Sequence, residues 1–193
     1  MMRSFFSDGP GAKESLAALV PARSIQTRDM AAEEFRADFK DGSHRLVCVV
    51  LGSDSAKVDF ECYARHGSVP WEDLLSGKAE SAQEVRLIVS SRSYYNFSFS
   101  DDHQWRSFGA QSPDVSVDLD LYAEVGTKTE QILSETTARG PVLTTLAIRG
   151  VQDSHQHRQF EVTRVLARSW VVILPNKMIG STMAHDAKTS ATN

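Results

Sequence analysis

Residues 115–149 are VSVDLDLYAEVGTKTEQILSETTARGPVLTTLAIR. Apolar and polar residues alternate strictly over 115–121, which predicts a strand with one buried face. Thr127 and Glu130 have the spacing of a helix capping box, so a helix is expected to begin here. The stretch 142–149 is again rich in β-branched and apolar residues and predicts a second strand. A strand, a capped helix and a strand therefore form the centre of the predicted fold.

The flanking stretches predict further strands. Apolar residues of 85–99 keep one parity throughout, which favours one long strand over two strands joined at Ser90–Ser93. Residues 104–109 predict a short strand, and 159–174 a long last strand. The parity of the last strand changes near Thr163-Arg164, which predicts a β-bulge.

From residue 84 to 174 the expected order is long strand, short strand, strand, capped helix, strand, strand. This order resembles the OB fold, a small five-stranded barrel. The segment Met30–Leu51, in which a helix leads into a strand, resembles helix-plus-barrel modules of uncharacterised bacterial proteins. The resemblance implies a mostly β fold with peripheral helices (α+β), built as a small OB-like or Greek-key barrel with an N-terminal helix and hairpin. A different α+β arrangement is the alternative.

Upstream of the barrel, the sequence predicts helices and a hairpin. Residues 11–20 and 28–40 predict helices, the second because Ala and Phe recur every four positions. The apolar run 44–51 and the alternating run 57–63 flank a turn and predict a hairpin. Pro70 opens a short helix.

These elements predict one compact domain. A hairpin alone is marginally stable in water, so the predicted hairpin should pack on the barrel. The expected divisions are a flexible arm at 1–10, a globular domain at 11–175 (a helical and hairpin part at 11–83, a barrel-like part at 84–175), and a disordered tail at 176–193.

Composition excludes several classes of protein. The 193 residues carry a net charge of −4, with 41 % hydrophobic and 24 % charged residues, which is typical of a globular chain. An acidic chain argues against nucleic acid as an obligate partner. No apolar run approaches a membrane span, and no signal-peptide core begins the chain, so we expect a cytoplasmic protein without a membrane partner. Glycine-rich phosphate loops and the CxxC, HExxH and GxSxG motifs are absent.

The chain has two cysteines, Cys48 and Cys62, both in apolar segments that predict buried thiols. In the expected hairpin Cys48 lies opposite Phe60, with Cys62 as a diagonal neighbour. That geometry allows a disulfide without favouring it. Two cysteines without clustered histidines do not make a zinc site, and no cofactor is expected.

Aromatic residues cluster between 94 and 108. Parity assigns Tyr95, Phe97 and Phe99 to the core and leaves Tyr94 on the other face. An exposed aromatic ring with arginines nearby is a stacking platform for bases or sugars. The ligand-binding candidates are Tyr94, Arg86, Arg92 and Arg106.

Acidic residues and histidines supply the catalytic and metal candidates. Carboxylates and imidazoles are the groups that acid–base catalysis needs, although turns and solvated strand faces carry the same residues. The catalytic candidates are Asp102, His103, Asp118 and Asp120. His155 and His157 have a spacing that suits weak metal binding in an extended segment.

Three functional hypotheses follow. The first is a non-enzymatic binding or interaction module that holds a protein partner or a small ligand. The second is an enzyme with a dispersed carboxylate and histidine site, which requires a cleft that gathers at least two candidates. The third is a single-strand nucleic-acid-binding protein, which requires Tyr94 and at least two of the three arginines exposed on one concave face.

Overall fold

The fold is seen in a computed structural model, which describes residues 2–26, 31–79, 81–113, 115–151 and 158–172. The protein is mostly β, with two sheets and a few short helices, as the sequence predicts. No helix among the described residues is long and apolar enough to cross a membrane.

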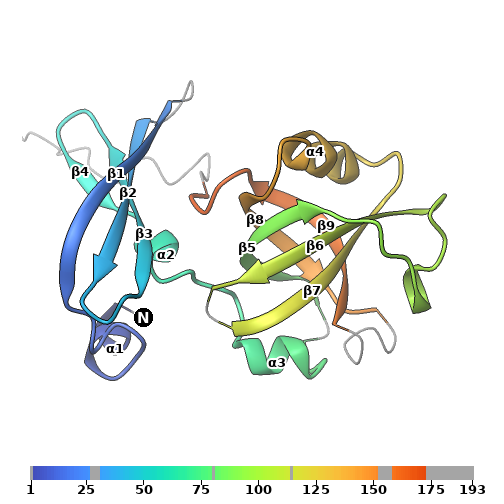
Figure 1. The fold of residues 1–193 in the computed structure, drawn as a ribbon, viewed down its shortest axis with the longest axis horizontal. Helices are drawn as coiled ribbons and strands as arrows, with labels where there is room; N and C mark the ends of the chain where they lie inside the picture. Colours follow the sequence, from blue (N-terminus) through green and yellow to red (C-terminus); the bar gives the residue numbers. More distant parts are fainter. Residues whose placement is uncertain (1, 27–30, 80, 114, 152–157, 173–193) are drawn as a thin grey trace, which may run out of the picture.

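The C-terminal sheet is a five-stranded barrel (Figure 1). Its strands are β5 (Gln83–Ser91), β6 (Trp105–Ser112), β7 (Val115–Glu124), β8 (Val142–Arg149) and β9 (Gln159–Ala167). Hydrogen-bonded neighbours follow the order β5-β6-β7-β9-β8, and β8 pairs with β5. Every pairing is antiparallel except β7 with β9, which spans only three residue pairs. The ring is therefore completed through one short parallel seam.

Helix α4 (Lys128–Thr137) lies between β7 and β8. Thr127 is its N-cap, and the side chain of Thr127 accepts a hydrogen bond from the backbone N–H of Glu130 at 3.2 Å. The predicted strand, capped helix and strand are thus confirmed. The position of α4 between the third and fourth strands of the barrel is the one expected from the sequence.

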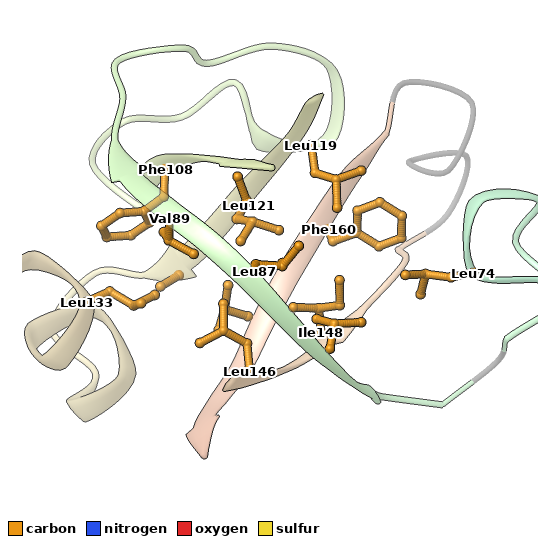
Figure 2. Close-up of a cluster of buried hydrophobic side chains, with 14 residues drawn as sticks. Leu74, Leu87, Val89, Phe108, Leu119, Leu121, Leu133, Leu146, Ile148 and Phe160 are labelled. Atoms are coloured by element: carbon orange, nitrogen blue, oxygen red, sulfur yellow. The ribbon is translucent and has the colours of Figure 1, made fainter. Parts of the chain in front are cut away.

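The barrel interior is filled by the alternating apolar residues of all five strands. Figure 2 shows these side chains pointing toward one another, with Leu133 of α4 and Leu74 of α3 (Trp71–Leu75) at opposite ends of the cluster. Leu119 and Leu121 are among the buried residues, whereas the alternating Asp118 and Asp120 belong to the outer face. The alternation predicted for this strand is confirmed over residues 117–121.

A separate four-stranded sheet precedes the barrel and lies beside it in Figure 1. Its strands, in the order β1-β2-β3-β4, are β1 (Leu16–Gln26), β2 (Ala31–Phe39), β3 (His44–Leu51) and β4 (Ala56–Val58). Two short helices, α1 (Met2–Ser7) and α2 (Phe60–Tyr63), accompany it. Phe5 of α1 packs against Phe60 and Tyr63 of α2, with ring centroids 5.4 and 5.9 Å apart. Residues 1–10, expected to be a flexible arm, therefore include a helix that contacts α2.

A small apolar cluster joins the sheet to the barrel. Cys48, Cys62, Trp170 and Val171 are buried together, and partly buried residues of β3, β5 and β8 pack against them. Arg86 of β5 is also fully buried here and donates to the backbone oxygens of Trp170, at 3.0 Å, and of His66.

The helices predicted at 11–20 and 28–40 are wrong. Residues Leu16–Gln26 and Ala31–Phe39 form the strands β1 and β2 instead, which pair antiparallel from Leu16↔Phe39 to Gln26↔Ala31. The helical spacing in 28–40 is a weak local signal, because Ala and Phe fit a pleated sheet as well. Pairing of β2 with neighbours on both sides overrides that signal.

The predicted hairpin is correct in its first half only. β3 pairs with β4 from Val49↔Val58 to Leu51↔Ala56, but the strand expected over 57–63 ends at Val58. The side chain of Asp59 accepts a hydrogen bond from the N–H of Cys62 at 3.0 Å and so caps helix α2. Because Asp59 caps a helix, the chain enters α2 here, although the alternating pattern of 57–63 predicts a strand.

The long strand predicted over 85–99 is also wrong, because β5 ends at Ser91. The chain then forms a loop and a short 3₁₀ helix, η1 (Phe97–Phe99). Phe97 is 51 % exposed, and Phe99 is buried. The predicted bulge in β9 is confirmed by a register shift between the pairs Ala147↔Arg164 and Ile148↔Val162.

Candidate functional site

A polar groove crosses the outer face of the barrel, over β5, β6 and β7. It encloses a cavity of about 430 Å³. The residues that line it are Ile88, Ser90, Arg92, Gly109, Ala110, Gln111, Asp118 and Pro141. It forms on this face because the interior of the barrel takes the apolar half of each alternating strand and leaves the polar half outside.

Gly109 forms the floor of the groove. A Cβ atom built there would lie 3.2 Å from Cδ of Arg92 and 3.5 Å from the hydroxyl of Ser90. A glycine inside a strand often marks a place where another group approaches the backbone closely. The missing side chain therefore lets the Arg92 side chain lie close over Gly109 in the middle of the groove.

Two hydrogen-bonded pairs set the charge pattern of the groove. The guanidinium of Arg92 donates to Asp120 at 2.7 Å, and the side-chain amide of Gln111 donates to Asp118 at 2.8 Å. Arg92 remains 44 % exposed at its side chain, while Asp120 is 16 % exposed. The ring centroid of Tyr94 lies 5.6 Å from the Arg92 guanidinium, close enough for a cation–π contact.

Asp120 is the electrostatically perturbed carboxylate of this group. Partial burial raises its pKa, the Arg92 charge opposes that rise, and the charge of Asp118 adds to it. Burial dominates because removing a carboxylate from water disfavours its charged form. Asp120 is therefore a more basic hydrogen-bond acceptor than an ordinary exposed aspartate.

An aromatic stack lies beside the groove. Phe99 is parallel to Tyr122 at 4.1 Å between ring centroids and meets Trp105 edge-on at 4.9 Å. The Tyr122 hydroxyl accepts a hydrogen bond from the Gln159 side chain at 3.1 Å. Burial, and next the Asp120 charge, raise the pKa of Tyr122. Phe99 is buried, as predicted, but it stacks on Tyr122 and is not part of the barrel core to which its parity assigned it.

The structure brings together four of the candidates predicted from sequence. Arg92, Tyr94, Asp118 and Asp120 lie in or beside the groove. The sequence missed Gly109 and Gln111. Gly109 carried a usable signal, since it is a glycine within a predicted strand. Gln111 carried none, because a glutamine on a solvated strand face is ordinary.

The other candidates lie elsewhere. Arg86 is buried at the junction with the N-terminal sheet. Arg106 points toward α4, 3.7 Å from Glu130. His103 is 98 % exposed at its side chain in a turn, 3.9 Å from Asp102. His155 and His157 lie outside the described residues, and the described residues contain no group of three or more metal-ligating side chains.

A second cavity, of about 360 Å³, opens at the junction between sheet and barrel. Arg45 and Arg86 line it together with Trp71. Both arginines are already engaged: Arg45 pairs with Glu14, and Arg86 bonds to backbone oxygens. This cavity therefore offers a ligand fewer available polar groups than the groove does.

Comparisons with family models, with curated proteins and with solved structures returned no match.

Proposed function

We propose that this protein is a binding module and that the groove over β5, β6 and β7 holds a small, uncharged, polyhydroxylated ligand such as a saccharide. The observation that carries the proposal is that Arg92, Gln111 and Asp118 line one groove with Gly109, and that Asp120 holds the Arg92 guanidinium beside it.

The choice of ligand follows from the hydrogen-bonding chemistry. The carboxylates accept hydrogen bonds, the guanidinium and the amide donate them, and Ser90 can do both. Hydroxyl groups can donate and accept, so neighbouring hydroxyls match an alternating set of this kind. Tyr94, 39 % exposed, adds an aromatic surface at one end. Pockets of this size, with a few convergent polar groups, are typical of small-ligand sites.

The charge of the groove argues against the nucleic-acid hypothesis. One arginine, Arg92, faces two carboxylates, Asp118 and Asp120, so their sum is −1. Of the three arginine candidates only Arg92 accompanies Tyr94. A phosphate backbone would meet repulsion there instead of the basic surface that it needs.

The enzyme alternative has partial support, because the groove gathers two of its four acid–base candidates. Asp120 is held by Arg92 and Asp118 by Gln111, an arrangement that suits fixed acceptors for a ligand. No described histidine, cysteine or lysine lines the groove to complete a nucleophilic or acid–base set. Binding without turnover is therefore the favoured proposal.

A titration of the full chain tests this proposal. Neutral mono- and oligosaccharides, a single-stranded oligonucleotide and buffer alone are added, and heats of binding are measured. Wild type is compared with Gly109→Val, which adds a side chain at the groove floor. It is also compared with Asp118→Asn, which replaces a carboxylate acceptor with an amide. Arg149→Gln removes an ion pair with Glu161 on the far side of β8 and serves as the control.

We expect saccharide binding by wild type and by the Arg149→Gln control. Gly109→Val should lose measurable binding, because its side chain would displace the Arg92 side chain that lies over Gly109. Equal binding by wild type and Gly109→Val would place the ligand elsewhere. Heat with the oligonucleotide alone would favour the nucleic-acid hypothesis.

The N-terminal sheet supports a second candidate, a protein–protein interaction. Several exposed large apolar side chains lie on this sheet: Leu16, Leu19, Val20, Leu51 and Val58. Strand β1 has 11 residues and pairs with β2 on one side only. Exposed apolar edges of this kind are sites where another chain adds a strand.

The first partner to consider is a second copy of this chain. Analytical ultracentrifugation over a range of protein concentrations measures whether the chain dimerises. Dimerisation that Leu19→Lys abolishes would support edge pairing. A monomer at every concentration would exclude a second copy as the partner.

A further inference from the structure

The two cysteines of the chain meet at the junction between sheet and barrel. Cys48 lies on β3 and Cys62 on α2, and their Sγ atoms are 2.9 Å apart. Both residues are fully buried, under Trp170 and Val171. Both are free thiols in this structure. The sequence allowed this contact but predicted a different geometry, with both residues on paired strands.

We propose that Cys48 and Cys62 are a disulfide-forming site, closed and opened by exchange with a low-molecular-weight disulfide. An S–S bond is about 2 Å long, so joining the two sulfurs needs only a small movement of α2 toward β3. The proposal does not depend on the ligand groove.

The local structure places the two sulfurs together. The N–H of Cys62 donates to the side chain of Asp59, which caps the start of α2, and the N–H of Asp59 donates to the backbone oxygen of Cys48 at 2.8 Å. Asp59 therefore positions the first turn of α2 directly over Cys48. The Cys48 thiol lies 3.8 Å from the buried Glu34 carboxylate, and the other side chains of the cluster, Trp170 and Val171, are apolar. Uncharged thiols or an uncharged disulfide suit such surroundings better than a thiolate does.

The exchange balances in two steps. One cysteine thiolate attacks a sulfur of the small disulfide, forms a mixed disulfide and releases one small thiolate. The second cysteine thiolate attacks the mixed disulfide at the protein sulfur and releases the other. The small disulfide gains two electrons, and the two protons of the cysteine thiols end on the released thiols. Small thiols reverse both steps.

Closed packing protects the reduced pair. The hydrogen bond with Cys62, then burial, raise the pKa of the Cys48 thiol, and the nearby carboxylates of Glu34 and Asp59 act in the same direction. The thiolate needed for attack is thus suppressed in the folded state. Exchange begins when α2, a helix of four residues, opens locally and admits the reagent.

A disulfide here would fasten the chain that leads from the sheet to the barrel. His66 follows α2 closely, and its backbone oxygen accepts from Arg86 of the barrel. Linking α2 covalently to β3 restrains this contact as well. The oxidised protein should therefore resist opening at the junction more than the reduced protein.

The test equilibrates the full chain in glutathione buffers from fully reduced to fully oxidised. Samples are quenched with acid, denatured, alkylated with N-ethylmaleimide and analysed by intact mass and peptide mapping. We expect a monomer that loses two hydrogens, takes up no alkyl group and yields a peptide linking Cys48 to Cys62. Cys62→Ser is the matched control and should yield only free or glutathione-capped Cys48.

A second measurement needs no variant. Oxidised wild type should melt roughly 6–12 °C above reduced wild type, because the bond closes a loop of about 15 residues. Two alkylatable thiols at every buffer ratio, glutathione-capped chains or disulfide-linked dimers would each overturn the proposal. Equal melting temperatures for the disulfide-linked and reduced forms would contradict the inference that the disulfide strengthens the junction.

Discussion

Phe99 and its neighbour Phe97 show how single residues decide the surface beside the groove. The two belong to one 3₁₀ turn, yet Phe99 is fully buried on Tyr122 and Phe97 is 51 % exposed. Flat stacking at 4.1 Å buries two rings and holds the loop after β5 against the outer sheet. The loop position that supports Tyr94 therefore depends on Phe99.

Replacing Phe99 with alanine should lower the free energy of unfolding by about 3–5 kcal/mol, the cost of emptying a fully buried aromatic site. Urea denaturation measures it. Phe97→Ala is the matched control from the same turn and should change stability by less than about 1 kcal/mol. Equal losses for the two variants would contradict the stacking account.

Asp120 predicts a pH dependence with a defined sign. Burial raises the pKa of Asp120 in the folded state. The carboxyl therefore contributes to folding stability fully below its unfolded pKa, and this stabilisation is lost as pH rises through the folded pKa. The stability of wild type minus that of Asp120→Asn should therefore fall as pH rises from the ordinary aspartate pKa of about 3.9 through the raised folded pKa. Urea melts across this range measure the difference.

Asp41 supplies a control of opposite sign. The hydroxyl and N–H of Ser43 lower the pKa of this exposed carboxyl, so its contribution appears as pH rises. The stability of wild type minus that of Asp41→Asn should rise as pH increases from the lowered folded pKa to the ordinary aspartate pKa, and should then stay level. A difference for Asp120→Asn that also rises would show that the Arg92 pair outweighs burial.

At the scale of elements, local signals predicted the barrel better than the N-terminal sheet. Strand β7, helix α4 and strand β8 each combine a clear period with a cap or a turn, and tertiary pairing agrees with them. In 28–40 the spacing of Ala and Phe suits a helix, but pairing with β1 and β3 makes it a strand. Short-range patterns cannot report such long-range pairing.

The cap of α4 is the element-scale feature most open to a simple test. Thr127→Ala removes the bond to the N–H of Glu130 and should cost about 1 kcal/mol of stability. Lys128→Ala, at the adjacent exposed position, should be nearly neutral. Thermal or urea unfolding of both variants checks this, and equal stability of Thr127→Ala and wild type would show that the cap does not stabilise α4.

At the scale of the whole molecule, Arg86 connects sheet and barrel. Its side chain is fully buried, bonds to two backbone oxygens, and lies within 3.4 Å of Glu61 and 2.9 Å of Glu84. The sequence predicts this arginine as a ligand-binding candidate. Its burial was not predictable from nearby residues, because the two backbone oxygens that it binds, those of His66 and Trp170, are 20 and 84 positions away.

Arg86→Met should destabilise the protein by about 3 kcal/mol, since it leaves buried acceptors without a donor. The urea-unfolding transitions followed by far-UV circular dichroism and by tryptophan fluorescence should also have different midpoints, because Trp170 lies at the junction. Lys78→Met breaks an exposed ion pair with Asp73 and should change neither. Coincident, unshifted transitions for Arg86→Met would contradict a joining role.

The candidate site was only partly predictable for a similar reason. Parity put Tyr94, Asp118 and Asp120 on outer faces, but it could not show that β5, β6 and β7 lie side by side. That adjacency comes from barrel closure, which turns separate polar faces into one groove. Gly109 and Gln111 gain a role only after closure.

Amide chemical-shift mapping of the full chain during a saccharide titration tests the binding proposal most directly. The account predicts shifts centred on Ser90, Arg92, Gly109, Gln111 and Asp118, and none in Gly109→Val. Shifts centred on the N-terminal sheet, or the same shifts in wild type and Gly109→Val, would contradict it.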